Sequence, residues 1–210
     1  SHAYIAEAVR KGAVAILTHT REGFELAKKM CPCALLVSQD LDQFREAHWR
    51  LAKAFFGNPS GTMQVIGVTG TNGKTTTAWM LRDMFAAIGT RSAYIGTLGF
   101  HLRGEERTLQ NTTPFSIDLN RMLAEAREVG VYSVAMEVSS HALKERRADG
   151  IEFDAAIFTN LTQDHLDYHG TMEDYERSKR RLFEDFPNQT SKRFVAALNV
   201  EDPIGAKWAD

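Results

Sequence analysis

The sequence has 210 residues, of which 43% are hydrophobic and 25% are charged, and its formal net charge is −2. This balance is typical of one large or two small soluble domains, and it argues against a general nucleic-acid-binding protein. No apolar stretch is long enough to cross a membrane and no secretory signal opens the chain, so we expect a cytoplasmic protein in which Cys31 and Cys33 are reduced.

The first part of the chain alternates predicted helices with short apolar strands. Helical spacing of apolar residues covers residues 4–10, 22–30 and 41–56, and aliphatic runs at residues 13–17 and 34–37 are typical of buried strands. This alternation predicts a partial, small α/β domain.

A cluster of turn-forming residues at positions 57–61 marks the predicted domain boundary. We therefore expect one domain over residues 1–60 and a second over residues 61–210.

The second domain opens with a candidate phosphate-binding loop. A β-branched run at residues 65–69 leads into a glycine-rich turn, and a helix begins near Lys74. Gly70 and Gly73 allow the backbone to approach an anion, while the free N–H groups and the dipole of the helix start attract negative charge. Lys74 can reach the outer phosphates of a nucleotide.

The residues after Lys74 favour a nucleotide site over a simple connecting turn. The hydroxyl of Thr75 or of Thr76 can hold Mg²⁺, whereas turn chemistry alone does not ask for Lys followed by two Thr. The loop departs from the common pattern G-x-x-x-x-G-K-[ST], because Val68 stands where the first Gly would be.

The rest of the chain repeats strand and helix. Predicted helices cover residues 74–88, 116–129 and 171–186, predicted strands cover residues 93–95, 131–136, 155–158 and 194–198, and a polar segment covers residues 101–113. This order predicts an α/β fold with a P-loop-type, mostly parallel sheet flanked by helices. In such sheets the chemistry lies at the carboxyl ends of the strands.

Polar residues follow two of these strands. Glu137 ends one strand, where an acidic residue can serve Mg²⁺ or its water shell, although a surface carboxylate is the alternative. Residues 164–169 follow the strand that ends near Asn160, and they hold two His and two Asp. That density beside a phosphate site favours a metal or substrate role, and His165 could bind a cation through its neutral imidazole.

Lys179 lies on the apolar stripe of the predicted helix at residues 171–186. It comes four residues after Tyr175 and four before Phe183, so it shares their face of the helix. A lysine on a core-facing stripe must extend its charge to solvent, pair with an acidic group, or change its charge.

Three motifs, at residues 70–76, 137–141 and 159–169, together resemble the ATP-dependent Mur ligases of peptidoglycan synthesis. Residues 111–114, Asn-Thr-Thr-Pro, resemble the branch of the family that adds the third residue of the peptide. The likeness extends over nearly the whole chain, because residues 6–15 resemble the latter part of the family's first domain.

The resemblance implies a role for individual residues on the nucleotide side. The ATP phosphates would bind at Gly70, Thr71, Asn72, Gly73, Lys74, Thr75 and Thr76, with Lys74 on the outer ones. Thr75 and Glu137 would serve one Mg²⁺ and His165 a second. Lys179 matches a lysine that the family carries as a carbamate, which is an anion able to meet the metal. Asn199 would lie near the nucleotide, in a segment from which Glu201 departs.

On the substrate side, the resemblance implies contacts with a UDP-N-acetylmuramoyl-dipeptide. The contacting residues would be Asn111, Thr112, Thr113, Ser139 and Arg147, and Glu145 stands where the family can have a Gln that touches this substrate. The D-glutamate carboxylate would attack the γ-phosphate of ATP to give an acyl phosphate, and the amine of the incoming amino acid would then displace phosphate. Lys74, His165 and Lys179 would be the catalytic residues.

Compared with the family, the chain would hold the end of the first domain and an incomplete central domain. The C-terminal domain that binds the incoming amino acid would be absent, so we expect no useful ligation by this chain alone and a monomer when the protein is full-length. Two alternatives remain open: a related ligase, such as a folylpolyglutamate synthase or another Mur ligase, and a nucleotide-binding module without catalysis.

Overall fold

The computed structural model describes residues 2–209, so Ser1 and Asp210, the outer ends of the two predicted domains, lie outside the described residues. The chain forms two compact units, one up to His48 and one from Trp49 onward. Helix α3 (Leu41–Phe55) begins in the first unit and ends in the second. This division falls ahead of the turn at residues 57–61, and the boundary after residue 60 stays a prediction.

The first unit is a small α/β arrangement. In chain order it contains η1 (His2–Tyr4), α1 (Ile5–Arg10), β1 (Ala15–Thr18), α2 (Arg21–Met30), β2 (Cys33–Leu36) and the start of α3. The two strands pair in parallel, with Ala15 opposite Cys33. Thr20 caps α2, since its side chain accepts a hydrogen bond of 3.1 Å from Gly23 N.

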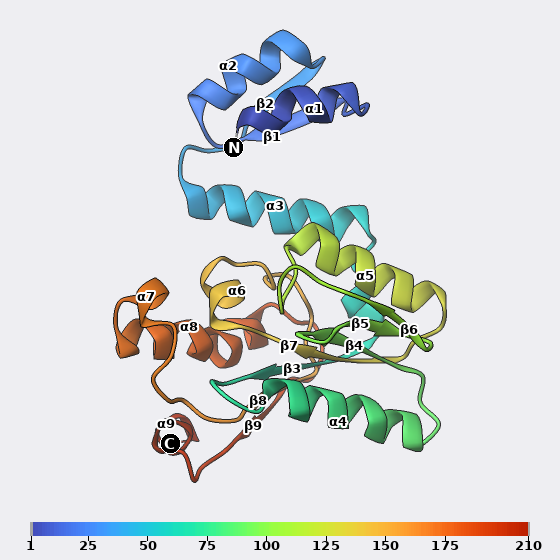
Figure 1. The fold of residues 1–210 in the computed structure, drawn as a ribbon, viewed down its shortest axis with the longest axis vertical. Coiled ribbons are helices and arrows are strands. Elements are labelled where there is room, and N and C mark those ends of the chain that lie inside the picture. The colour runs from blue at the N-terminus through green and yellow to red at the C-terminus, as the bar shows by residue number, and fades with distance from the viewer. Residues whose placement is uncertain (1, 210) are drawn as a thin grey trace. The chain divides into compact units, whose positions relative to one another are not determined.

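The second unit is built on a seven-stranded sheet within the described residues (Figure 1). Its order is β6 (Glu105–Arg107), β5 (Gly99–Leu102), β4 (Ser92–Gly96), β7 (Ser133–Glu137), β3 (Gln64–Thr69), β8 (Ala155–Phe158) and β9 (Val195–Leu198). The five strands from β4 to β9 are parallel, which confirms the predicted mostly parallel sheet.

The edge hairpin of this sheet corrects one prediction. The sequence indicates only a polar segment at residues 101–113, yet β5 and β6 form an antiparallel edge there. The side chains of β6 are exposed, so this strand needs no apolar residues and carries no hydrophobic signal.

Helices cover both faces of the sheet (Figure 1). They are η2 (Pro59–Thr62), α4 (Lys74–Ala87), α5 (Ser116–Glu128), α6 (Ser140–Lys144), α7 (Leu166–His169), α8 (Met172–Glu184), η3 (Phe186–Asn188) and α9 (Pro203–Ala209). None of the helices formed by residues 2–209 combines the length and apolar character of a membrane span.

The core follows from the alternation of side chains along each strand. On β4, Ala93 and Ile95 join the larger apolar cluster with Leu119 of α5, whereas Tyr94 joins the smaller cluster with Ala78 of α4. The helices α4 and α5 therefore lie on opposite faces, and the strand ends between them remain open for polar residues.

Candidate active site

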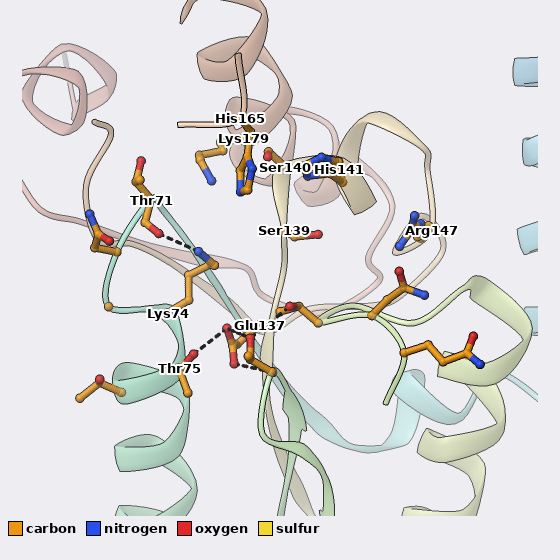
Figure 2. Close-up of a pocket in the computed structure, with 17 residues that line it drawn as sticks. Thr71, Lys74, Thr75, Glu137, Ser139, Ser140, His141, Arg147, His165 and Lys179 are labelled. Carbon is orange, nitrogen blue, oxygen red and sulfur yellow. Dashed lines mark hydrogen bonds between the residues drawn. The ribbon is translucent and has the colours of Figure 1, made fainter. Parts of the chain in front are cut away.

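A cavity of about 600 Å³ opens at the carboxyl ends of β3, β4 and β7 (Figure 2). Its lining comes from residues 71–76, 110–112, 137 and 139–141, together with Thr97, Arg147, His165 and Lys179. The cavity thus lies at the strand ends, where the sequence predicts the chemistry, and it brings together side chains that are more than 100 residues apart in the sequence.

The glycine-rich loop has the backbone geometry of an anion cradle. Gly70 and Gly73 adopt positive φ angles of 147° and 84°. A Cβ atom at Gly70 would lie only 1.9 Å from Thr159 Oγ1, so only glycine fits there. No described side chain caps the first turn of α4, and its N–H groups are therefore open to an anion.

Lys74 folds across this loop. Its Nζ donates hydrogen bonds to Gly70 O at 3.0 Å and to Thr71 O at 2.8 Å. Burial lowers the pKa of Lys74, while the nearby carboxylates of Glu137 and Asp164 act in the opposite direction. The ammonium group thus bonds only to neutral carbonyl oxygens of the loop, and the negatively charged oxygens of a phosphate would be stronger acceptors.

The segment after β8 holds the loop in place. Asn160 receives two backbone hydrogen bonds, from Thr71 N to its carbonyl and from Asn72 N to its Oδ1, both at 2.9 Å. Thr159 donates to Asn72 O at 2.6 Å. The predicted motif at residues 159–169 therefore begins with residues that support the phosphate loop.

Glu137 lies at the base of the cavity and is fully buried. Thr75 Oγ1 donates to Glu137 Oε2 at 3.0 Å, and Thr97 N donates to Glu137 Oε1 at 2.8 Å. The structure thus rejects the alternative of a surface carboxylate. A hydroxyl and a carboxylate are the hard oxygen donors that suit Mg²⁺, and the described residues contain no cluster of three or more His, Cys, Asp or Glu side chains arranged to hold a metal by themselves.

Lys179 is only 1% exposed, although it lines the cavity. Its Nζ donates to Gly70 O at 2.7 Å and lies 4.5 Å from the ring centre of Tyr175. Burial, and then the positive charge of Lys74, holds the pKa of Lys179 well below its usual value. Extension of the charge to solvent is therefore excluded, and no ion pair of Lys179 is found among residues 2–209, although the charge of Asp164 acts on it weakly.

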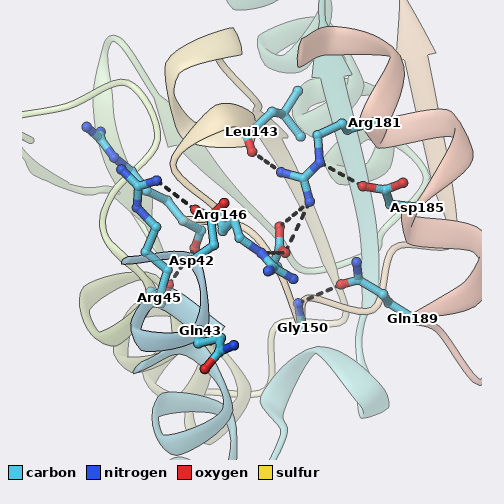
Figure 3. Close-up of polar contacts among 12 residues, drawn as sticks. Asp42, Gln43, Arg45, Leu143, Arg146, Gly150, Arg181, Asp185 and Gln189 are labelled. Carbon is cyan, nitrogen blue, oxygen red and sulfur yellow. Dashed lines mark hydrogen bonds and ion pairs between the residues drawn. The ribbon is translucent and has the colours of Figure 1, made fainter. Parts of the chain in front are cut away.

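Arg181 anchors α8, the helix that carries Lys179, through hydrogen bonds and ion pairs (Figure 3). Arg181 of α8 pairs with Asp185 at 2.7 Å and with the buried Asp149 at 3.2 Å, and it also donates to Leu143 O of α6. These contacts join α8 to α6 and so help to fix the position of α8, which carries Lys179. The sequence does not predict these contacts; it shows only that Arg181 lies away from the apolar face of the predicted helix.

The group at residues 164–169 separates into two roles. His165 lines the cavity with a half-exposed side chain, 3.4 Å from Asp164, and its ring contacts that of His141. His169 is instead buried and forms a 3.0 Å hydrogen bond with Ser140 Oγ, so its environment is structural. Burial lowers the pKa of both His141 and His169.

The residues predicted to contact a dipeptide substrate also divide. Asn111, Thr112, Ser139 and Arg147 line the cavity, and Arg147 pairs there with Glu145 at 2.6 Å. Two predicted substrate contacts, Thr113 and Glu145, do not line this cavity, and neither does Asn199, which was predicted to lie near the nucleotide. Thr113 is buried and donates to Glu137 O at 2.9 Å, and Asn199 donates to Thr159 O at 2.7 Å.

Four cavity residues were missed by the sequence reasoning: Thr97, Gln110, Ser140 and His141. Thr97 follows the last residue of β4 directly, so the same strand-end rule that found Glu137 would have found it. Ser140 and His141 lie within a motif that the sequence did single out, but the structure was needed to place them on the cavity wall.

Comparisons with known proteins agree with this geometry. Residues 68–210 match the model of the Mur ligase middle domain. A protein of Geobacter metallireducens named "UDP-N-acetylmuramoyl-L-alanyl-D-glutamate--2,6-diaminopimelate ligase" is 41% identical over 99% of the chain, and one of Synechococcus elongatus with the same name is 43% identical over 96%. The chain spans about 40% of the length of these relatives.

Solved structures give the same result. A structure of a ligase with that name covers 100% of the chain with a TM-score of 0.78 and 28% identity, and the chain covers 39% of it. A folylpolyglutamate synthase of Mycobacterium tuberculosis covers 77% with a TM-score of 0.56 and 17% identity, which shows a shared fold alone; the chain covers 43% of that structure. Because the family model covers well over half of the residues and the motifs meet in one cavity, the chain belongs to the Mur ligase family.

Proposed function

We propose that the protein to which this chain belongs is an ATP-dependent ligase that adds the third amino acid to UDP-N-acetylmuramoyl-L-alanyl-D-glutamate. The observation that carries this proposal is the single cavity shared by the phosphate loop, the Thr75–Glu137 pair and the buried Lys179. The names of the relatives favour diaminopimelate as the amino acid. The protein would work as a cytoplasmic monomer, and this chain would supply its ATP and Mg²⁺ site.

The phosphate loop would bind ATP through its backbone. The open N–H groups of α4 would face the phosphates, and Lys74 would exchange its contacts with Gly70 O and Thr71 O for the outer phosphates. Asn160 and Thr159 hold the backbone of Asn72 from the side, and Gly73 would let the chain pass close to the anion. Thr76 lines the same wall, and Asn199 would approach the nucleotide from the β8 side.

The residues at the base of the cavity fit a magnesium ion. Thr75 and Glu137 would hold it, with phosphate oxygens and water completing the ligands, and His165 would serve a second ion. Such an ion neutralises negative charge on the transferred phosphoryl group. The protein would keep Glu137 buried and oriented toward the cavity.

Lys179 would act as a carbamate. Its lowered pKa favours the neutral amine, and only the neutral amine has the lone pair that forms an N–C bond with carbon dioxide, with loss of a proton to water. The product would be an anion beside Lys74 and the proposed metal site, where a second cation is disfavoured. The burial of Lys179 and the proximity of Gly70 support this assignment.

The dipeptide substrate would bind on the wall opposite the phosphate loop. Asn111 and Thr112 supply an amide and a hydroxyl there, and Ser139 and Arg147 add donors for a carboxylate. Glu145 would act through Arg147, to which it is paired, and Thr113 would hold the loop against Glu137 O.

Nucleotide binding by this chain tests the proposal. Lys74→Ala should weaken Mg-ATP binding by about 10- to 100-fold in calorimetry, because a charge-assisted contact contributes about 1.5–3 kcal/mol. Lys207→Ala removes an exposed lysine paired with Glu176 and should leave binding unchanged. Equal binding by the two variants would contradict the proposal. Selective binding of a folate over the UDP-muramoyl-dipeptide would instead favour the folylpolyglutamate synthase alternative.

A further inference from the structure

Tyr94 lies in the middle of β4, is fully buried, and has no role in the site described so far. Its side chain points to the face of the sheet that α4 covers. The hydroxyl donates a short hydrogen bond to Glu137 Oε1, and it also accepts one of 3.3 Å from Leu98 N. The proposed metal carboxylate therefore has a phenol as a partner on the side away from the cavity.

The two oxygens of Glu137 are held by different kinds of donor. Oε1 accepts hydrogen bonds from Tyr94 OH and Thr97 N. Tyr94 lies within β4, and Thr97 is the residue directly after this strand. Oε2 receives the hydroxyls of Thr75 at 3.0 Å and Thr97 at 3.2 Å, and both threonines line the cavity. Rotatable hydroxyls can turn away from Oε2 when a cation arrives, whereas Oε1 keeps its partners.

Gly96 leaves the space that this arrangement needs. A Cβ atom there would lie 2.3 Å from Glu137 Oε1 and 2.3 Å from Tyr94 OH. Gly96 is not among the glycines with positive φ, so its missing side chain serves space rather than backbone conformation. It stands two residues after Tyr94 on the same strand face, directly beside the hydrogen bond.

The ring of Tyr94 is itself locked. It packs edge to face against Trp79 at 5.2 Å and against His101 at 5.6 Å, measured between ring centres. Trp79 lies one helical turn after Thr75 on α4, so the same helix supplies the hydroxyl at Oε2 and the wall behind the phenol. A donor held in this way fixes the direction of the carboxylate.

We propose that Tyr94 is a positioning residue for the divalent cation: it holds Glu137 Oε1 so that Oε2 is presented to the metal beside Thr75, and Gly96 makes this contact sterically possible. This inference rests on the proposed function, because it requires that Glu137 serve a cation. Hydrogen-bond partners behind metal ligands set ligand orientation, and their loss typically costs about 10- to 100-fold in metal affinity.

The test is the metal dependence of ATP binding by this chain, with Mn²⁺ as the probe and electron paramagnetic resonance to count free Mn²⁺. Tyr94→Phe removes one oxygen and keeps the ring packing, and it should raise the half-saturating Mn²⁺ concentration by about 10- to 100-fold. Gly96→Ala should raise it at least as much. Ser92→Ala is the matched control, because it removes a hydroxyl from the same strand face that bonds only Arg82 O.

The outcomes separate this inference from the proposed function. A change in the metal-free unfolding midpoint of Tyr94→Phe, with unaltered Mn²⁺ dependence, would overturn the positioning role and leave the function standing. Failure of the unaltered chain to bind ATP in a metal-dependent way would overturn both. Equal shifts in Tyr94→Phe and Ser92→Ala would also overturn the inference, because they would mark a general effect of losing a β4 hydroxyl.

Discussion

Two buried ionisable groups in the second unit have opposite surroundings. Glu152 is 4% exposed and receives hydrogen bonds from Asn58 at 2.7 Å, from Lys53 at 3.0 Å and from Ser191 at 2.8 Å. Burial alone would raise the pKa of Glu152, but these donors lower it to about 2. Lys179 is 1% exposed and has one hydrogen bond, to a neutral carbonyl, with the cation of Lys74 nearby.

The comparison separates a charge that stabilises the fold, on Glu152, from an ionisable group suited to reaction, on Lys179. The surroundings of Glu152 stabilise its ion and join η2, α3 and the segment after η3, so its charge contributes to folding. The surroundings of Lys179 disfavour its ammonium ion and so favour the neutral amine, which is the form that can react. Four variants or conditions test this contrast.

The largest effect is expected for Lys179→Ala on ligation by the full-length protein. Loss of the proposed carbamate should lower the rate about 10²- to 10³-fold, or about 2.7–4 kcal/mol in the barrier. Added short-chain carboxylic acids should restore part of the rate, because they can occupy the space with a carboxylate. The measurement is ligation rate with and without the added acid.

A rate loss without rescue by the acid would contradict the proposed carbamate but not the proposed metal site at Thr75 and Glu137. Labelled bicarbonate supplies a direct control on this chain, since a carbamate carbon should give an NMR signal in the unaltered protein and none in Lys179→Ala.

Glu152→Gln should cause the next largest effect, on stability and not on nucleotide binding. Removing the charge leaves Lys53 and Asn58 with poorer partners, and breaking a buried, paired carboxylate costs about 3 kcal/mol. Urea unfolding measures this loss. Glu184→Gln is the matched control, because it removes an exposed carboxylate paired with Arg180 and should change stability by less than about 0.5 kcal/mol.

Acid should remove the same contribution in the unaltered chain. The pKa of Glu152 is about 2 in the folded state against an ordinary 4.5, so its stabilisation is complete above pH 4.5 and is lost as the pH falls toward 2. The full difference corresponds to about 3 kcal/mol. The stability gap between the unaltered chain and Glu152→Gln should therefore narrow on acidification, and a constant gap would show that the charge is not its source.

Much of the fold could be predicted because it depends on local patterns. The parallel strands β3, β7 and β8 are short apolar runs between amphipathic helices, and the loop at residues 70–76 is defined by its own residue types. The edge strand β6 could not be predicted, because an exposed strand shows no alternation of apolar residues.

The site was predictable where strand ends carry it and unpredictable where it depends on contacts across the fold. Glu137 and His165 follow predicted strands, so their place at one sheet edge could be inferred. The phenol behind Glu137 comes from the middle of β4, where Tyr94 looks like an ordinary core residue. The burial of Glu152 among partners 39 to 99 residues away has no counterpart in the sequence pattern.

The smallest effect is expected for Lys179→Met on stability. Methionine matches the length of the lysine stem and fills the same buried space without a polar end. The carbonyl of Gly70 loses one donor but keeps Lys74 Nζ at 3.0 Å, so no buried acceptor is left unsatisfied. We therefore expect the free energy of unfolding to change by less than about 1 kcal/mol, measured by urea unfolding beside Glu152→Gln. A loss of about 3 kcal/mol would mean that Lys179 holds the fold together as Glu152 does, and the contrast between a structural and a chemical charge would fail.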